Sequence, residues 1–140
     1  MPVVPSSEGL TAAIKAGEIS KTGIPVVGSD GMLIEQYKDP WVWPVATATV
    51  STMRIMAQYA YDKGARSFGI VYDSQYKFGV EGAKAYQEHV ATLGGAQMKA
   101  FVGVRPGESS YSSEVQKFNS DCNPCDMVAM LLEPGTAETW

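Results

Sequence analysis

The sequence alternates short apolar runs, rich in β-branched residues, with segments long enough to form amphipathic helices. Such an alternation is typical of repeated βαβ units, because parallel strands need a crossover connection and the crossover helices cover the sheet. The sequence therefore predicts an α/β fold built on a parallel sheet. The predicted strands are residues 2–4, 24–28, 42–46, 68–72, 98–104 and 127–132.

Helices are predicted between these strands, where apolar side chains recur every three or four residues. The predicted helices span residues 8–22, 50–63, 80–93 and 111–118. Glycines follow three of them and provide the left-handed stop that other residues resist. Residues 29–40 are expected to form a loop. Pro44 restricts the strand at 42–46 to an edge or a bulge, since proline cannot donate to a strand ladder.

The composition narrows the class of protein. With 45% apolar and 19% charged residues in a chain of 140, there is enough apolar surface for a packed domain. The 11 Lys and Arg residues are scattered and are outnumbered by 15 Asp and Glu residues, which argues against nucleic acid as a partner. No apolar run approaches the roughly 20 residues of a membrane span, and residues 1–17 lack the pattern of a signal peptide.

Ligands of open α/β sheets bind outside the carboxyl ends of the strands, where loops meet helix N-termini. Ser6 and Ser7 lie at a predicted helix N-terminus, where they either cap the helix or hold a small anion such as a carboxylate. Ser29, Asp30 and Gly31 either form a turn or present a carboxylate to a ligand ammonium group. The loops singled out by this rule are residues 5–9, 28–31, 46–49, 73–79, 105–110 and 133–136.

Residues suited to catalysis or cofactor binding are few. His89 is the single histidine, and its place within a predicted helix favours a partly exposed structural residue over a catalytic base. The sequence contains neither of the glycine-rich patterns that cradle nucleotide phosphates. We therefore predict a protein that is not an enzyme and uses no cofactor.

Cys122 and Cys125 form a CxxC motif, which fits a redox pair, half of a zinc site or a structural disulfide. The motif follows a predicted helix instead of starting one, so the helix dipole that lowers a thiol pKa is missing, which argues against a redox pair. A zinc site needs four ligands, and one distant histidine does not complete the set, so no metal is predicted. A disulfide in an oxidising compartment is favoured, with two free cytosolic thiols as the remaining alternative.

Several stretches of the chain carry a family likeness. The most specific is residues 64–95, GARSFGIVYDSQYKFGVEGAKAYQEHVATLGG, in which a strand ends at Asp73 and Phe78-Gly79 precedes a long helix. The others are Ser6-Ser7, residues 22–31 (TGIPVVGSDG), residues 40–60 (PWVWPVATATVSTMRIMAQYA) and residues 106–118 (PGESSYSSEVQKF). In this order they resemble type I periplasmic solute-binding proteins, the class that includes the leucine/isoleucine/valine-binding proteins of ABC transporters. The likeness covers nearly the whole chain, which covers well under half of a usual family member.

The resemblance implies a set of ligand-binding residues. In the family, serines after the third strand and the loop after the fourth strand hold the carboxylate and the ammonium group of an amino acid. The corresponding residues here are Ser6, Ser7, Ser29, Asp30 and Gly31. A cleft-lining aromatic residue, commonly Tyr, corresponds to Phe78, which lacks the hydroxyl and offers ring packing alone. Asp30 adds a charge among small residues, so the site also suits ligands other than a simple branched-chain amino acid.

The resemblance further implies Rossmann-like lobes that close on a small ligand. Residues 1–48 correspond to the end of the first-lobe segment and residues 49–140 to the start of the second lobe, both incomplete, as expected of a fragment. The implied function is the ligand-binding component of an ABC importer, periplasmic or extracellular, with an amino-acid-like ligand and a membrane permease as partners. This secretory context favours the Cys122–Cys125 disulfide. The alternatives are the ligand-sensing domain of a receptor or regulator and a stand-alone flavodoxin-like enzyme.

Overall fold

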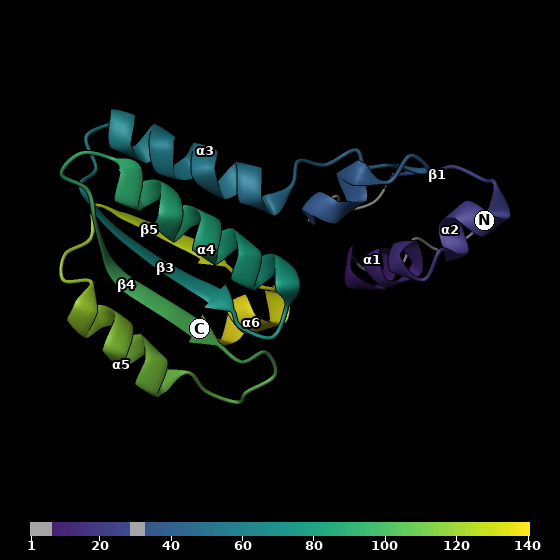
Figure 1. Cartoon of the computed structure of the whole chain (residues 1–140). Helices are drawn as coiled ribbons and strands as arrows, with labels where there is room; N and C mark the ends of the chain where they lie inside the picture. Colours follow the sequence, from purple (N-terminus) through teal and green to yellow (C-terminus); the bar gives the residue numbers. More distant parts are fainter. Residues whose placement is uncertain (1–6, 29–32) are drawn as a thin grey trace. The chain divides into compact units, whose positions relative to one another are not determined.

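The computed structural model describes residues 7–28 and 33–140 (Figure 1). The chain divides into two compact units, Met1–Thr52 (unit 1) and Met53–Trp140 (unit 2). Helices alternate with strands, and the strand pairs of the described residues are all parallel. The predicted α/β fold with parallel pairing is therefore confirmed.

Unit 1 is built from short elements. Its helices are α1 (Ser7–Lys15), α2 (Glu18–Thr22) and the 3-10 helix η1 (Ile34–Lys38), and its strands are β1 (Val26–Val27) and β2 (Val42–Trp43). The two strands pair through Val26 with Val42 and Val27 with Trp43. Gln36 of η1 donates a hydrogen bond to the Thr11 hydroxyl of α1 at 3.4 Å, and both side chains are buried, as are those of Leu10 and Leu33.

Four predictions for unit 1 are wrong in detail. The strand predicted for residues 24–28 is limited to Val26–Val27. The single helix predicted for residues 8–22 is two helices, because Gly17 adopts the left-handed conformation at φ 71° between them. The loop predicted for residues 29–40 contains η1. The strand predicted for residues 42–46 ends at Trp43, directly before Pro44, which has no N–H to donate. The predicted strand at residues 2–4 lies outside the described residues.

Unit 2 contains a three-stranded parallel sheet of order β4-β3-β5. Its strands are β3 (Ser67–Asp73), β4 (Gln97–Val104) and β5 (Met127–Leu131). Its helices are α4 (Lys77–Thr92), α5 (Ser112–Asp121) and α6 (Pro134–Thr139). Most of α3 (Thr49–Asp62), which begins at the end of unit 1, also belongs to it. The strands and helices predicted for this half of the chain are present within a few residues of their predicted bounds, and α6 begins in the loop predicted at 133–136.

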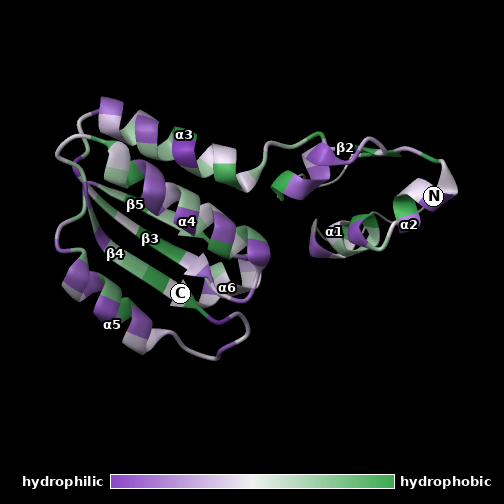
Figure 2. Ribbon diagram, in the orientation of Figure 1, coloured by the Kyte–Doolittle hydropathy of each residue, from purple (hydrophilic) through white to green (hydrophobic). Residues whose placement is uncertain are grey.

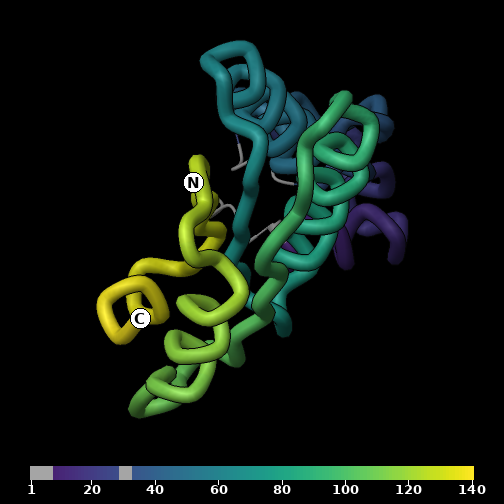
Figure 3. Tube along the Cα trace, turned by 90° about the vertical axis from the view of Figure 1, so that its left-hand side faces the viewer, coloured from purple at the N-terminus to yellow at the C-terminus, as the bar shows by residue number. Residues whose placement is uncertain are grey.

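The sheet of unit 2 is covered on both faces (Figures 1 and 3). On one face, Phe68 and Ile70 of β3 pack with buried residues of α3 and α4, and the Phe68 ring meets the Tyr86 ring edge-on at 6.1 Å. On the other face, Val71 packs with residues of β4 and α5 and with Trp140, which follows α6. The helices carry alternating hydrophilic and hydrophobic bands (Figure 2), as helices that cover a sheet with one side require. Burial on both faces explains why β3 is apolar at successive positions.

Gly69 lets α5 approach β3 closely. A Cβ atom at this position would lie 2.6 Å from the Cys122 sulfur and 2.9 Å from the Phe118 ring. The glycine therefore makes room for both side chains on the α5 face of the central strand.

Candidate functional site

The carboxyl ends of β4, β3 and β5 lie side by side at one edge of the sheet in unit 2. Three of the loops that the sequence singles out begin there, after Asp73, after Val104 and after Leu131. The chain leaves β3 through α4 toward β4, and it returns through α5 to β5 on the other side of β3. The carboxyl ends of β3 and β5 thus flank the point where the connections diverge, which is where open α/β sheets bind ligands.

Asp73 joins two of these loops. Its side chain is fully buried, and its Oδ2 atom accepts a hydrogen bond of 2.6 Å from the backbone N–H of Glu133, which follows β5. The other carboxylate oxygen, Oδ1, is also buried and has no hydrogen-bond partner within the described part of the chain. Asp73 therefore fixes the spacing of the β3 and β5 loops and retains an acceptor at this edge.

The loop between β3 and α4 is held at both of its ends. The backbone N–H and the hydroxyl of Ser74 each donate to the Val104 carbonyl at 2.8 Å, which ties the loop to the end of β4. At its other end, a Cβ atom on Gly79 would overlap the Asp73 carbonyl oxygen. The first turn of α4 can therefore lie against the end of β3 because residue 79 is a glycine.

Two aromatic rings lie in this loop and at the start of α4. Phe78, the predicted cleft-lining residue, is only 7% exposed, and its ring stacks on that of Tyr76 with centroids 5.7 Å apart and planes 14° apart. Tyr76 is partly exposed. Tyr76 was not predicted as a site residue, although two aromatic residues spaced two apart at the start of a helix are a visible signal.

The loop after β4 carries a cation. Arg105 is exposed and has no ion-pair partner among the residues that the structure describes. Its carbonyl accepts a 2.7 Å hydrogen bond from the Tyr111 hydroxyl, and the Tyr111 ring lies 6.3 Å from that of Trp140. These contacts secure the backbone at Arg105 and leave its guanidinium group available for an anion. The sequence singled out the loop at residues 105–110 but did not predict a role for Arg105 itself.

The predicted ligand residues of unit 1 are described only at Ser7, which is the first residue of α1. Ser6, Ser29, Asp30 and Gly31 lie outside the described residues. Phe78 belongs to unit 2, so the two predicted halves of the site belong to different units. Their roles in ligand binding stay predictions.

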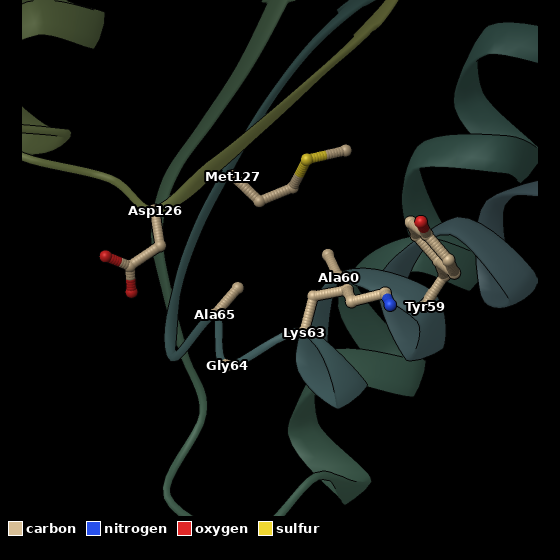
Figure 4. A pocket seen from close by; sticks show the side chains of 7 residues that line it. All are labelled: Tyr59, Ala60, Lys63, Gly64, Ala65, Asp126 and Met127. Carbon is tan, nitrogen blue, oxygen red and sulfur yellow. The ribbon is translucent and has the colours of Figure 1, made fainter.

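A separate cavity of about 500 Å³ opens at the opposite, amino edge of the sheet (Figure 4). Tyr59 of α3 and Lys63, which directly follows α3, line one side, and Asp126 and Met127 line it where β5 begins. The Lys63 ammonium group lies 5.6 Å from the centre of the Tyr59 ring. This cavity is at the edge where open α/β sheets do not place their ligands.

Asp126 has a structural role at that edge. Its Oδ2 atom accepts hydrogen bonds of 2.9 Å from the backbone N–H groups of both Arg66 and Ser67. These bonds hold the pKa of the Asp126 carboxyl below its ordinary value, and the bond from Arg66 has the largest effect. The carboxylate thereby joins the start of β5 to the start of β3.

The remaining candidates are structural in character. Cys122 and Cys125 form a disulfide at the end of α5, as favoured by the sequence. His89 is partly exposed and its Nε2 atom lies 3.1 Å from the Gln58 side-chain oxygen.

Across residues 7–28 and 33–140, no group of three or more His, Cys, Asp and Glu side chains is placed to hold a metal ion. None of the helices described is long and apolar enough to cross a membrane.

Comparisons with known proteins point in one direction. The sequence profile of a family described as periplasmic binding protein matches residues 4–140. Comparison with curated proteins finds no match. Three solved structures share the fold.

The first is an ABC transporter solute-binding protein from R. palustris in complex with 4-hydroxybenzoate, with TM-score 0.71 and 18% identity over 87% of this chain. The second, from Rhodopseudomonas palustris HaA2, is a solute-binding protein in complex with p-hydroxybenzoic acid, with TM-score 0.69 and 20% identity over 87% of the chain. The third is a putative branched-chain amino acid ABC transporter protein from Rhodospirillum rubrum, with TM-score 0.59 and 16% identity over 82% of the chain. The chain spans 32% of the length of each of the three.

Proposed function

Because the chain belongs to the periplasmic binding protein family, we propose that it captures a small molecule between two lobes for an ABC importer. The observation that carries the proposal is the family match over residues 4–140. The parallel order of β4, β3 and β5 supports it, because ligands of open α/β sheets bind at the carboxyl ends of the strands. In this reading residues 1–48 belong to the first lobe and residues 49–140 to the second. The protein works in the periplasm or outside the cell, with a membrane permease as its partner.

The ligand in this proposal is an amino acid or a similar small polar metabolite with a carboxylate. Arg105 at the carboxyl edge of the sheet is a suitable carboxylate partner, because guanidinium groups bind carboxylates in a planar, two-bond geometry. In the first lobe, Ser6, Ser7, Ser29, Asp30 and Gly31 bind the carboxylate and ammonium groups. The solved structures with related folds hold a hydroxybenzoate or carry a branched-chain amino acid label, and each of these ligands is a small carboxylic acid.

A ligand-sensing domain of a receptor or regulator is the second candidate, since the same fold and edge serve a sensor equally well. The family match argues against the stand-alone flavodoxin-like enzyme, because the family is one of binding proteins. Transport and sensing differ in what the ligand-bound protein contacts next, so a pull-down with the cognate permease separates them.

The proposal is tested by the shift in melting temperature of the protein, expressed from its complete coding sequence, across a panel of amino acids and other small carboxylic acids. A ligand bound by the native state alone raises the melting temperature by mass action, by an amount that grows with concentration. Arg105→Gln is expected to reduce the shift caused by the best acid, while Lys84→Gln, on the exposed side of α4, serves as the charge-matched control. The absence of a shift for every compound in the panel would contradict the proposal.

A further inference from the structure

We propose that Tyr76 is the specificity-determining residue of this site, and that its ring, backed by Phe78, selects ligands that carry a planar ring together with a carboxylate. The inference rests on the proposed function and names the class of ligand. It is drawn from the two stacked rings after β3, from the hydrogen bonds that hold their loop and from Arg105 in the neighbouring loop after β4.

The geometry of the stack assigns different tasks to the two rings. With centroids 5.7 Å apart and planes 14° apart, each ring is the stacking partner of the other, so no ligand ring fits between them. Phe78 is the buried member, at 7% exposure, and Tyr76 is the partly exposed member. A ligand therefore meets the outer face of Tyr76 and not Phe78. Tyr76 also brings the phenol hydroxyl that Phe78 lacks.

The loop that carries Tyr76 is fixed before any ligand arrives. Ser74 makes two hydrogen bonds to the Val104 carbonyl, and the Tyr76 carbonyl accepts the backbone N–H of Val80 at 3.1 Å as the first bond of α4. Gly79, the residue after Phe78, is held in place by its close approach to the Asp73 backbone. A flat ring held in one orientation loses little freedom on binding, so it favours flat ligand surfaces over flexible or puckered ones.

The loop after β4, next to the loop that holds Tyr76, carries a cation at the same edge of the sheet. Arg105 directly follows Val104, the residue to which the loop is tied, and it has no ion-pair partner within residues 7–28 and 33–140. Lys77, next to Tyr76 in the chain, is instead paired with Glu81 at 3.2 Å. A carboxylate on the ligand therefore finds its partner in Arg105 while its ring lies on Tyr76.

The test uses two probes that differ in ring shape and share size and charge, namely benzoate and cyclohexanecarboxylate. Their dissociation constants are measured by isothermal titration calorimetry for the protein from its complete coding sequence and for Tyr76→Ala, Tyr76→Leu and Tyr76→Phe. Tyr59→Ala is the matched control, because Tyr59 is an exposed tyrosine on α3 at the opposite edge of the sheet. Circular dichroism verifies the fold of each variant, and Tyr76→Leu keeps Phe78 covered if the alanine variant does not fold.

The expected result is tighter binding of benzoate than of cyclohexanecarboxylate, with benzoate weakened about three- to tenfold by Tyr76→Ala and Tyr76→Leu. Tyr76→Phe keeps the preference for the planar ring, and Tyr59→Ala changes neither constant. Equal binding of the two probes, failure of both to bind, or an unchanged benzoate constant in the Tyr76 variants would overturn the inference. Each of these results leaves the proposed function standing if another acid in the panel raises the melting temperature. If no acid does, the proposed function fails, and the inference fails with it.

Discussion

Unit 2 buries apolar side chains on both faces of a three-stranded sheet, whereas unit 1 pairs two strands of two residues each and leaves several apolar side chains exposed. Two valines show the contrast. Val71 in β3 is fully buried, and Val27 in β1 is 68% exposed. Both lie in parallel strands, so strand formation alone does not decide what a residue contributes to stability. That contribution is decided by whether helices cover both faces of the sheet and bury the side chain.

The comparison is tested most directly by the same substitution in both units. Val71→Ala is expected to lower the free energy of unfolding by about 3 kcal/mol, because it removes buried methyl groups and leaves a cavity. Val27→Ala is expected to change it by less than about 0.5 kcal/mol. Urea denaturation followed by circular dichroism measures both values. A similar loss in the two variants would mean that Val27 is buried in the working protein.

The next largest effect is expected from the disulfide of unit 2. Replacing Cys122 and Cys125 together by serine is expected to cost about 2 kcal/mol, since the bond closes a short loop and short loops restrict the unfolded chain least. A reductant is expected to lower the melting temperature of the unmodified protein and to leave that of the double variant unchanged. Two free thiols in the mass spectrum of protein isolated from the periplasm would contradict this prediction.

A smaller effect of opposite sign is expected at Tyr86 in the same core. The hydroxyl is buried with no hydrogen-bond partner among the described residues, and its burial raises the pKa of Tyr86 to about 12. Tyr86→Phe removes this unsatisfied group and keeps the edge-on contact with Phe68. The free energy of unfolding is expected to stay constant or to rise by up to about 1 kcal/mol. A clear loss in urea denaturation would reveal a partner for the hydroxyl.

The smallest effect is expected at Asp126, and it depends on pH. Its folded-state pKa lies below the unfolded value of 3.8, so the ionised carboxylate stabilises the fold above that pH. This contribution is lost as the pH falls through the lowered pKa of the folded state. Asp126→Asn is therefore expected to lower the melting temperature slightly near neutral pH and to have no effect in strong acid. A difference of the same size at both pH values would argue against a role for the charge.

The two units also differ in how well their sequences predicted them. β3, α4 and β4 were predicted within a few residues, because strong periodicity and flanking glycines agree there with the packing. In unit 1 the break at Gly17 was missed, since apolar spacing continues across it while the backbone turns at a left-handed glycine. Local periodicity does not report such a turn when the residues on both sides prefer a helix.

For the site, the sequence identified the loops but not the arrangement within them. The rule for parallel sheets predicted the edge at which the strands before Ser74, Arg105 and Leu132 end. The family resemblance assigned an aromatic contact to Phe78, which stays a prediction; in the structure its ring is mostly buried and stacks on that of Tyr76. Which of two nearby aromatic rings faces outward depends on the first turn of the helix and on its contact with Asp73, and no single sequence shows this.

The central position of β3 also has a consequence for how the sheet is assembled during synthesis. β3 is the first of the three strands to be translated, yet the contacts at its end reach residues 30 positions later on one side and 60 positions later on the other. Its second edge therefore stays open until β5 has been made, and a strand with an open edge is prone to pair with another chain. Delaying translation between β4 and β5 is expected to increase aggregation, whereas a delay before β3 is not.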